Sequence, residues 1–260
     1  MSFNIRGALY DDGVNRWANR SALNIQVIRR YMPDIIGFQE LHLANLTDYL
    51  KALPEYAFFL GPPYNNQQPF QYPAIFWKRE ELHHVSCGGF WLSSTPDRHS
   101  SAWDTDCIRS AAWVRLVWQR TGFEFLHINT HLDHVSESAR QNGAELIIRQ
   151  IESQLPVMIT GDFNCLPDSP VNAKFQTHGF RDTYKQAGYS APAYTFHHFE
   201  GSDFHPRTED FDRIDWILTR DWEEHTILES FTIIKDAVPP LFPSDHYPIM
   251  AVFRTSINPS

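Results

Sequence analysis

The 260-residue sequence predicts a single α/β domain, residues 1–260, in which two β-sheets pack face to face and helices flank them. Three observations predict this fold class. Helical and extended patterns alternate along the whole chain, and no repeat or low-complexity linker interrupts them. Hydrophobic residues make up 42% and aromatic residues 14% of the chain, which is enough for a packed core.

The first half of the chain alternates short apolar strands with helices that end before prolines. Residues 1–6 have a strand pattern. Residues 16–31 have helical spacing and stop before Pro33, and a second helix is expected at 41–53, before Pro54. Further strands are expected at 34–38, 56–60, 73–77 and 82–92.

The second half begins with an expected hairpin of strands 111–119 and 123–130 around Arg120-Thr121-Gly122. Residues 136–151 form the clearest amphipathic helix, with Ser136 as its N-cap. Strands follow at 156–160, 213–219, 226–234 and 247–254. Long loops that mix aromatic and polar residues are expected to be functional, namely 61–72, 93–108 and 200–211.

Charge and cysteine content restrict the function classes. The net charge of −9 disfavours tight, sequence-independent binding along a polyanion. Only five of the 22 basic residues are lysines, and arginines suit directional phosphate contacts better. The three cysteines fit neither a disulfide framework nor a zinc site, so we expect a reduced, cytoplasmic protein. No apolar run is long enough for a membrane span, so no membrane association is expected.

Three motifs place acidic and amide side chains where strands end. They are Gln39-Glu40, Gly161-Asp162-Phe163-Asn164 and Ser244-Asp245-His246. Open α/β sheets keep their chemistry at such strand ends. Hydrolysis of a phosphate ester with a hard cation needs carboxylates, amides and a histidine. The three motifs together supply this set.

Glu40 is the best candidate ligand for Mg²⁺ or Mn²⁺. Its alternative role is that of a helix N-terminal glutamate stabilised by the helix dipole of residues 41–53. Asp162 is suited to orient or deprotonate an attacking water, and Asn164 to hold that water or a phosphate oxygen. Ordinary turn chemistry is the alternative for this pair.

His246 can donate to a phosphoryl oxygen if a carboxylate orients it, and Asp215 is the expected partner. Asp245 is expected to add to the metal or water network. The alternative for this motif is a capped turn before the last strand. His131 is expected to contact phosphate, while the role of His134 stays open. A zinc site at these two histidines lacks a third ligand at a convincing distance.

Asn4 and Arg109 carry weaker signals. Asn4 ends the first strand and is a candidate for metal or water binding, and Arg109 is a candidate bidentate phosphate clamp. The alternative for Arg109 is a solvated or ion-paired side chain.

In identity and order, these motifs resemble the endonuclease/exonuclease/phosphatase superfamily, from Asn4 through Arg213-Ile214-Asp215 to His246. The resemblance implies a four-layer α/β sandwich and Mg²⁺-dependent phosphoester hydrolysis, with Mn²⁺ as a substitute. It implies that Glu40, Asn4 and Asp245 serve the metal, and it places Arg213 with the substrate-binding residues. The resemblance further implies catalytic roles for Asp162, Asn164, His246, Asp215 and His131.

The chain also resembles a compact bacterial branch of the superfamily, for which sugar-phosphate phosphatase activity is a possibility. The first hypothesis is therefore a phosphatase acting on a small phosphorylated molecule, in a pocket walled by Phe70, Tyr72, Trp91, Trp103 and Phe204. Plain loop packing of these aromatic residues is the alternative. The second hypothesis is a nuclease on DNA or RNA, with a lipid phosphodiesterase third. A phosphate-binding pseudoenzyme is disfavoured because the catalytic set is intact.

Overall fold

Two six-stranded sheets form the centre of the molecule. The computed structural model describes residues 1–151, 154–206 and 212–255, so residues 207–211 of the predicted 200–211 loop lie outside the described residues. The first sheet has the order β11-β12-β1-β2-β4-β3, with β1 Ser2–Asn4, β2 Ile35–Leu41, β3 Tyr56–Leu60, β4 Tyr72–Lys78, β11 Thr226–Ile233 and β12 Ile249–Thr255. The second has the order β5-β6-β7-β8-β10-β9, with β5 Leu82–Trp91, β6 Ser110–Trp118, β7 Glu124–His131, β8 Val157–Asp162, β9 Arg181–Asp182 and β10 Asp215–Arg220.

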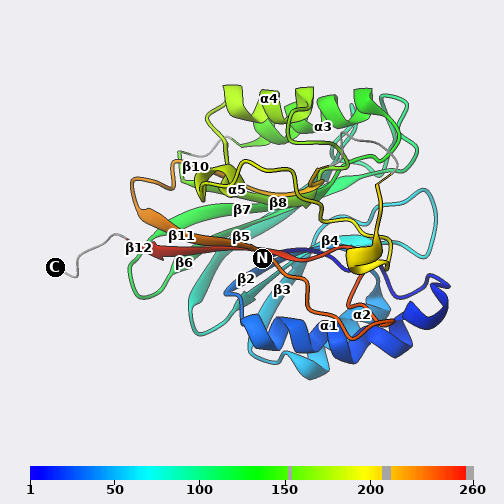
Figure 1. Cartoon of the computed structure of the whole chain (residues 1–260). Helices are drawn as coiled ribbons and strands as arrows, with labels where there is room; N and C mark the ends of the chain where they lie inside the picture. The colour runs from blue at the N-terminus through cyan, green and yellow to red at the C-terminus, as the bar shows by residue number, and fades with distance from the viewer. Residues whose placement is uncertain (152–153, 207–211, 256–260) are drawn as a thin grey trace.

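Helices cover the outer face of each sheet, so the molecule has four layers (Figure 1). The pair α1 and α2 covers the first sheet, and the pair α3 and α4 covers the second. Two 3₁₀ turns and a short helix α5 lie in the connections. The bounds are α1 Trp17–Tyr31, α2 Leu43–Ala52, α3 Glu137–Gln150, α4 Pro170–Thr177, α5 Thr183–Gln186, η1 Gly13–Asn15 and η2 Gly201–Asp203.

Three hydrophobic cores separate the four layers, because strand residues alternate between the two faces of a sheet. Ile36 and Phe38 of β2 pack against the α1/α2 side, together with Tyr49 of α2. Ile128 of β7 and Trp216 of β10 belong to the core under α3 and α4. The third core lies between the sheets and is formed by residues of both, including Ile35, Ile75, Val114, Phe125, Met158 and Ile217.

The space between the sheets changes from apolar to polar along its length. In its middle, Asn129 of β7 accepts a hydrogen bond from Gln39 Nε2 (2.6 Å) and one from Thr160 Oγ1 (3.1 Å). Asn129 Nδ2 donates across the gap to the carbonyl of Phe38 (2.7 Å). This network links the two sheets close to the strand ends that carry the motifs.

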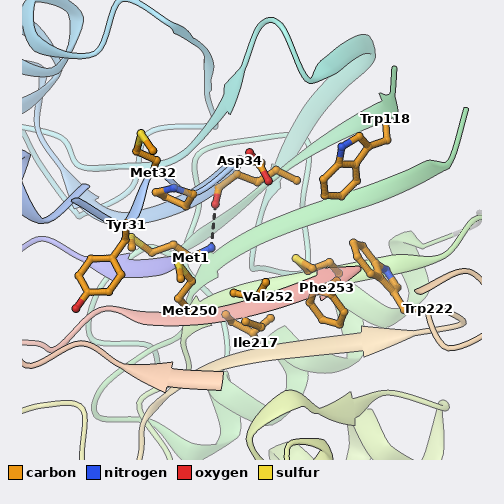
Figure 2. A pocket seen from close by; sticks show the side chains of 14 residues that line it. Met1, Tyr31, Met32, Asp34, Trp118, Ile217, Trp222, Met250, Val252 and Phe253 are labelled. Carbon is orange, nitrogen blue, oxygen red and sulfur yellow. Dashed lines mark hydrogen bonds between the residues drawn. The ribbon is translucent and has the colours of Figure 1, made fainter. Parts of the chain in front are cut away.

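The opposite end of the inter-sheet space is a mainly apolar cavity of about 190 Å³ (Figure 2). Met1, Trp118, Ile217, Trp222 and Phe253 are among its lining residues. The Met1 amino group donates to the carbonyl of residue 35 (2.9 Å) beside it. The three motifs predicted from the sequence do not line this cavity.

The predicted four-layer sandwich is confirmed, and most predicted elements are present with ends shifted by one to three residues. Ser136 caps α3 by accepting from the Ala139 amide (3.1 Å), as expected. Sequence reasoning missed α4, although Ser169 and Pro170 at its start form an ordinary N-cap and first-turn signal. Within the described residues, no helix is long and apolar enough to cross a membrane.

Candidate active site

The predicted site residues gather at one edge of the two sheets. β1 runs parallel to β2, and β7 runs parallel to β8, so their carboxyl ends lie together. β10 is antiparallel to β8, which places Asp215 opposite Asp162 at the same edge. His131 is also the register partner of Asp162. A single cavity of about 320 Å³ at this edge is lined by residues from both sheets, including Glu40, His131, Asp162, Asp245 and His246.

His246 and Asp215 form the predicted pair. His246 Nδ1 lies 2.8 Å from Asp215 Oδ2, and both side chains are buried. Burial disfavours the charged imidazolium, but the neighbouring carboxylates, Asp215 foremost, outweigh it and raise the pKa of His246 to about 10. The second ring nitrogen, Nε2, lies 3.8 Å from Asp162 Oδ2. His246 is therefore a charged donor aimed toward the position of Asp162.

Asn4 connects carboxylates of the two sheets. Its Nδ2 donates to Asp162 Oδ2 (2.9 Å) and to Glu40 Oε1 (3.0 Å), across 158 and 36 residues of sequence. Its Oδ1 accepts from the backbone amide of Arg6 (3.1 Å). In this structure, Asn4 thus holds the two carboxylates in place with its nitrogen.

Glu40 reaches the cavity through a β-bulge. The register of β2 on β4 shifts between Phe38 and Leu41, and Glu40 has φ of 62°. Strict alternation would point residue 40 toward the helix side, as it does Phe38, so the bulge turns the carboxylate into the cavity. The structure therefore replaces the helix-terminus alternative, because Glu40 lies in the strand and His42 is the N-cap of α2.

The carboxylates of Glu40, Asp162 and Asp245 line the cavity, and Asp215 lies beside Asp162 as its register partner. Burial, followed by the charge of Asp215, raises the pKa of Asp162, and burial together with Glu40 raises that of Asp245. Within the described residues, Asp215 Oδ1 is buried and lacks a hydrogen-bond partner. Such clustered oxygen donors, partly unsatisfied, fit a hard divalent cation.

His131 contributes a neutral imidazole. Its Nε2 lies 3.5 Å from Asp162 Oδ2, and its Nδ1 lies 3.4 Å from the hydroxyl of Tyr64. Burial, reinforced by the positive charge of Arg109, holds the pKa of His131 well below its usual range. The Tyr64 hydroxyl already accepts from the Glu40 amide (2.6 Å), so its own proton is free to go to Nδ1. That leaves Nε2–H as a neutral donor on the cavity side.

Asn164 lies in the cavity wall, in the left-handed conformation (φ 51°) directly after β8. Its backbone N–H donates to Asp162 Oδ1 (3.0 Å), and its side-chain Nδ2 donates to the Leu132 carbonyl (3.0 Å). Phe163 anchors this turn as predicted, stacked on Trp216 with ring centroids 4.3 Å apart. The turn that follows β8 is thus tied to the turn that follows β7.

Arg109 lines the cavity just before β6 and is 6% exposed. Its guanidinium NH2 lies 3.2 Å from His134 Nδ1, and its Cζ lies 5.6 Å from the Tyr64 ring centroid. His134 also lines the cavity and is exposed at its rim. Arg109 and His134 are therefore both at the site, and neither the solvated nor the ion-paired alternative describes Arg109 among the described residues.

The position of Arg213 differs from the sequence prediction. It does not line the cavity, although it precedes Asp215 by only two residues. It is 1% exposed and forms an ion pair with Asp182 (2.8 Å), while its Cζ lies 3.9 Å from the Tyr184 ring centroid. Because its charge is already matched by a buried carboxylate, Arg213 joins β10 to β9 and α5.

The aromatic loop residues that were predicted to form the pocket wall also lie elsewhere. None of Phe70, Tyr72, Trp91, Trp103 and Phe204 lines the cavity. The 61–72 and 93–108 loops instead pack on each other through His99, whose ring contacts Phe70 and Trp91. Plain loop packing, the alternative, describes Phe70 and Trp91.

Sequence reasoning missed several residues that complete the site. Gln71 Nε2 donates to Glu40 Oε2 (3.2 Å) and to the Tyr10 hydroxyl (2.9 Å). Arg6 lies 3.8 Å from Asp245 and stacks on Tyr10. The mixed aromatic and polar character of the 61–72 loop was the available signal for Gln71 and Tyr64. Phe196, whose ring packs edge-on against His246, had no such signal.

Comparison with known proteins identifies the family. The Endonuclease/Exonuclease/phosphatase family matches residues 1–246. The chain belongs to this family. The family is one of phosphoesterases.

Two solved members are similar over nearly the whole chain. An endonuclease/exonuclease/phosphatase of Bacteroides vulgatus is 31% identical with a TM-score of 0.86, covering 98% of this chain and 97% of that one. A protein described as the mannosyl-6-phosphatase of Bacteroides thetaiotaomicron is 30% identical with a TM-score of 0.86, covering 97% of this chain and 98% of that one.

The match to curated relatives is shorter. An uncharacterised protein of Acanthamoeba polyphaga mimivirus is 29% identical over 169 residues, which are 58% of this chain and 60% of that protein. The chain therefore spans less than two thirds of that relative's length.

Proposed function

We propose that this chain is a metal-dependent phosphatase acting on a small phosphorylated substrate such as a sugar phosphate. The observation that carries the proposal is the cavity itself. It has a volume of about 320 Å³ and combines the buried acidic group with His246 and Arg109. This volume is at the small end of the range for small-molecule sites, and the net charge of −9 disfavours a polyanion. The likeness to a mannosyl-6-phosphatase at 30% identity supports a sugar phosphate.

Glu40 and Asp245 are the proposed ligands of Mg²⁺, with Mn²⁺ able to substitute. Glu40 is presented by the bulge and held by Asn4 and Gln71, while Asp245 precedes His246 in the same wall. When bound, the cation would supply positive charge against the phosphoryl oxygens. Its charge would also offset the burial and the carboxylate repulsion that raise the pKa of Asp162 and Asp245.

Side chains of the protein carry out the proton transfer and stabilise the developing charge. Asp162 accepts the proton of the attacking water as the new oxygen–phosphorus bond forms and the ester oxygen–phosphorus bond breaks, and the released alkoxide takes a proton from solvent water. The products are the free alcohol and inorganic phosphate. His246, kept charged by Asp215 at 2.8 Å, donates to a phosphoryl oxygen on which negative charge accumulates. His131 adds a neutral N–H, and Asn164 orients water or phosphate.

The test is release of phosphate from a panel of sugar phosphates and nucleotides with Mg²⁺ or Mn²⁺. Labelled single-stranded DNA and RNA are assayed beside the panel. Asp162→Ala and His246→Ala serve as inactive controls, and Asp162→Asn covers the case in which the alanine variant does not fold. Turnover of one monoester that both controls abolish would establish the phosphatase.

Two results would reject the proposal. Cleavage of nucleic acid without monoester turnover would make the chain a nuclease. Phosphate binding without turnover above that of the Asp162→Ala control would make it a binding protein.

A further inference from the structure

We propose that Arg109, held in position by His134, makes the site select phosphoryl groups that carry two negative charges. Monoesters would then be preferred over diesters because of this pair. The inference rests on the proposed phosphatase function and names the substrate feature that the site recognises.

Arg109 is a buried cation without a matching anion. Within the described residues, no carboxylate lies within ion-pair distance of it, and its Nε is buried without a hydrogen-bond partner. Two other arginines show the contrast, since Arg213 pairs with Asp182 at 2.8 Å and Arg6 with Asp12 at 3.0 Å. Removing a guanidinium from water without an anion is costly, so the geometry at Arg109 points to an anion supplied by the substrate.

His134 orients Arg109 without neutralising it. A guanidinium only donates hydrogen bonds, so His134 Nδ1, at 3.2 Å from the Arg109 NH2, must be the acceptor. Its proton is then on Nε2, which faces Asp106 Oδ2 at 3.7 Å. A carboxylate in place of His134 would orient the guanidinium equally well. It would also neutralise the positive charge of Arg109, which then could not attract the substrate phosphate.

The same tautomer excludes a second metal site. Asp106, Cys107 and His134 offer ligand atoms within 4.8 Å of one another. A protonated Nε2 has no lone pair for a metal, and the Arg109 cation lies directly behind the ring. The cluster is therefore better explained as part of the frame around Arg109.

Asp133 holds the frame together. This buried carboxylate accepts five hydrogen bonds, and they come from both sides of the pair. Three come from the segment that leads to Arg109 and two from the turn that follows His134. The donors are Thr105 Oγ1 (2.8 Å) and the backbone amides of Asp106 (3.1 Å), Cys107 (3.2 Å), Val135 (3.0 Å) and Ser136 (2.7 Å). His134 is thus a positioning residue on a rigid support.

Charge selection follows from this arrangement. Above pH 7, a monoester phosphate carries a charge close to −2, whereas a diester carries −1 and brings a second ester arm into a cavity of about 320 Å³. The full charge of Arg109 favours the dianion, because a charge-assisted hydrogen bond strengthens with the charge of its acceptor.

The test compares two substrates with the same leaving group, p-nitrophenyl phosphate and methyl p-nitrophenyl phosphate, at pH 8 with Mg²⁺. Arg109→Ala is expected to lower kcat/KM for the monoester by roughly 100-fold and for the diester by less than about threefold. His134→Ala is expected to lower the monoester value by about tenfold, mainly through KM. His134→Gln, which keeps an acceptor, should restore most of the loss, and exposed His83→Ala is the matched control.

Binding of non-hydrolysable phosphonates separates this inference from the proposed function. Phenylphosphonate is a dianion at pH 8 and its methyl monoester is a monoanion, and calorimetry with Mg²⁺ measures both. Wild type should prefer the dianion, and Arg109→Ala and His134→Ala should lose that preference. If wild type hydrolyses nothing but keeps this preference, the phosphatase is rejected and the selection stands. Equal losses on both substrates, or no dianion preference in wild type, overturn the selection.

Discussion

His127 is expected to make the stability of this protein depend on pH. It lies on β7 in the space between the sheets, is 0% exposed, and its Nε2 is 2.9 Å from Thr160 Oγ1. Within the described residues, its Nδ1 has no hydrogen-bond partner. Burial lowers the pKa of His127 from 6.5 to about 3. The folded state therefore resists protonation at a position that the unfolded chain protonates readily.

The sign follows from linkage. Because the folded pKa is the lower one, stability is full above pH 6.5 and is lost as the pH falls from 6.5 toward 3. At pH 5, which lies about 1.5 units below the unfolded pKa, His127 is protonated in the unfolded state and neutral in the folded state. This protonation stabilises the unfolded state by about 2 kcal/mol. At pH 7.5, this contribution is close to zero.

The assay is urea unfolding at pH 7.5 and pH 5.0 for wild type and His127→Gln, which keeps a donor toward Thr160 but does not titrate. Other buried histidines, such as His197, contribute equally to both proteins. The wild type should therefore lose about 2 kcal/mol more than the variant between the two pH values. Exposed His178→Gln should behave as wild type. An equal pH dependence in His127→Gln would refute the reasoning.

Three further outcomes follow from the site and the fold. Removing divalent metal with EDTA should abolish phosphate release, and Mg²⁺ or Mn²⁺ should restore it; activity that persists in EDTA would contradict the proposed metal ligands. Asp215→Asn should lower kcat by roughly 100-fold or more, because His246 loses the carboxylate that keeps it charged; unchanged phosphate release would contradict that role. Gly37→Ala should destabilise the protein by about 1–3 kcal/mol in urea unfolding, because the new Cβ would lie 2.0 Å from Thr160 Oγ1; wild-type stability would show that the sheets separate easily.

Local patterns in the sequence determined the elements and the kinds of side chain at their ends. The strand predicted at 56–60 has the observed bounds of β3, and the predicted Ser136 cap is present. Burial period, proline stops and capping residues depend on neighbours within a few positions, so the linear sequence carries them. Carboxylates at strand ends could be recognised for the same reason.

The tertiary structure decided which of those side chains meet. Nothing within a few residues distinguishes Arg109, which faces the cavity, from Arg213, which is matched by Asp182 from another element. The bulge that turns Glu40 inward depends on how β2 pairs with β4, and Gln71 meets Glu40 only through that pairing. Strand register and the packing of the sheets fix these contacts, and both are properties of the folded chain as a whole.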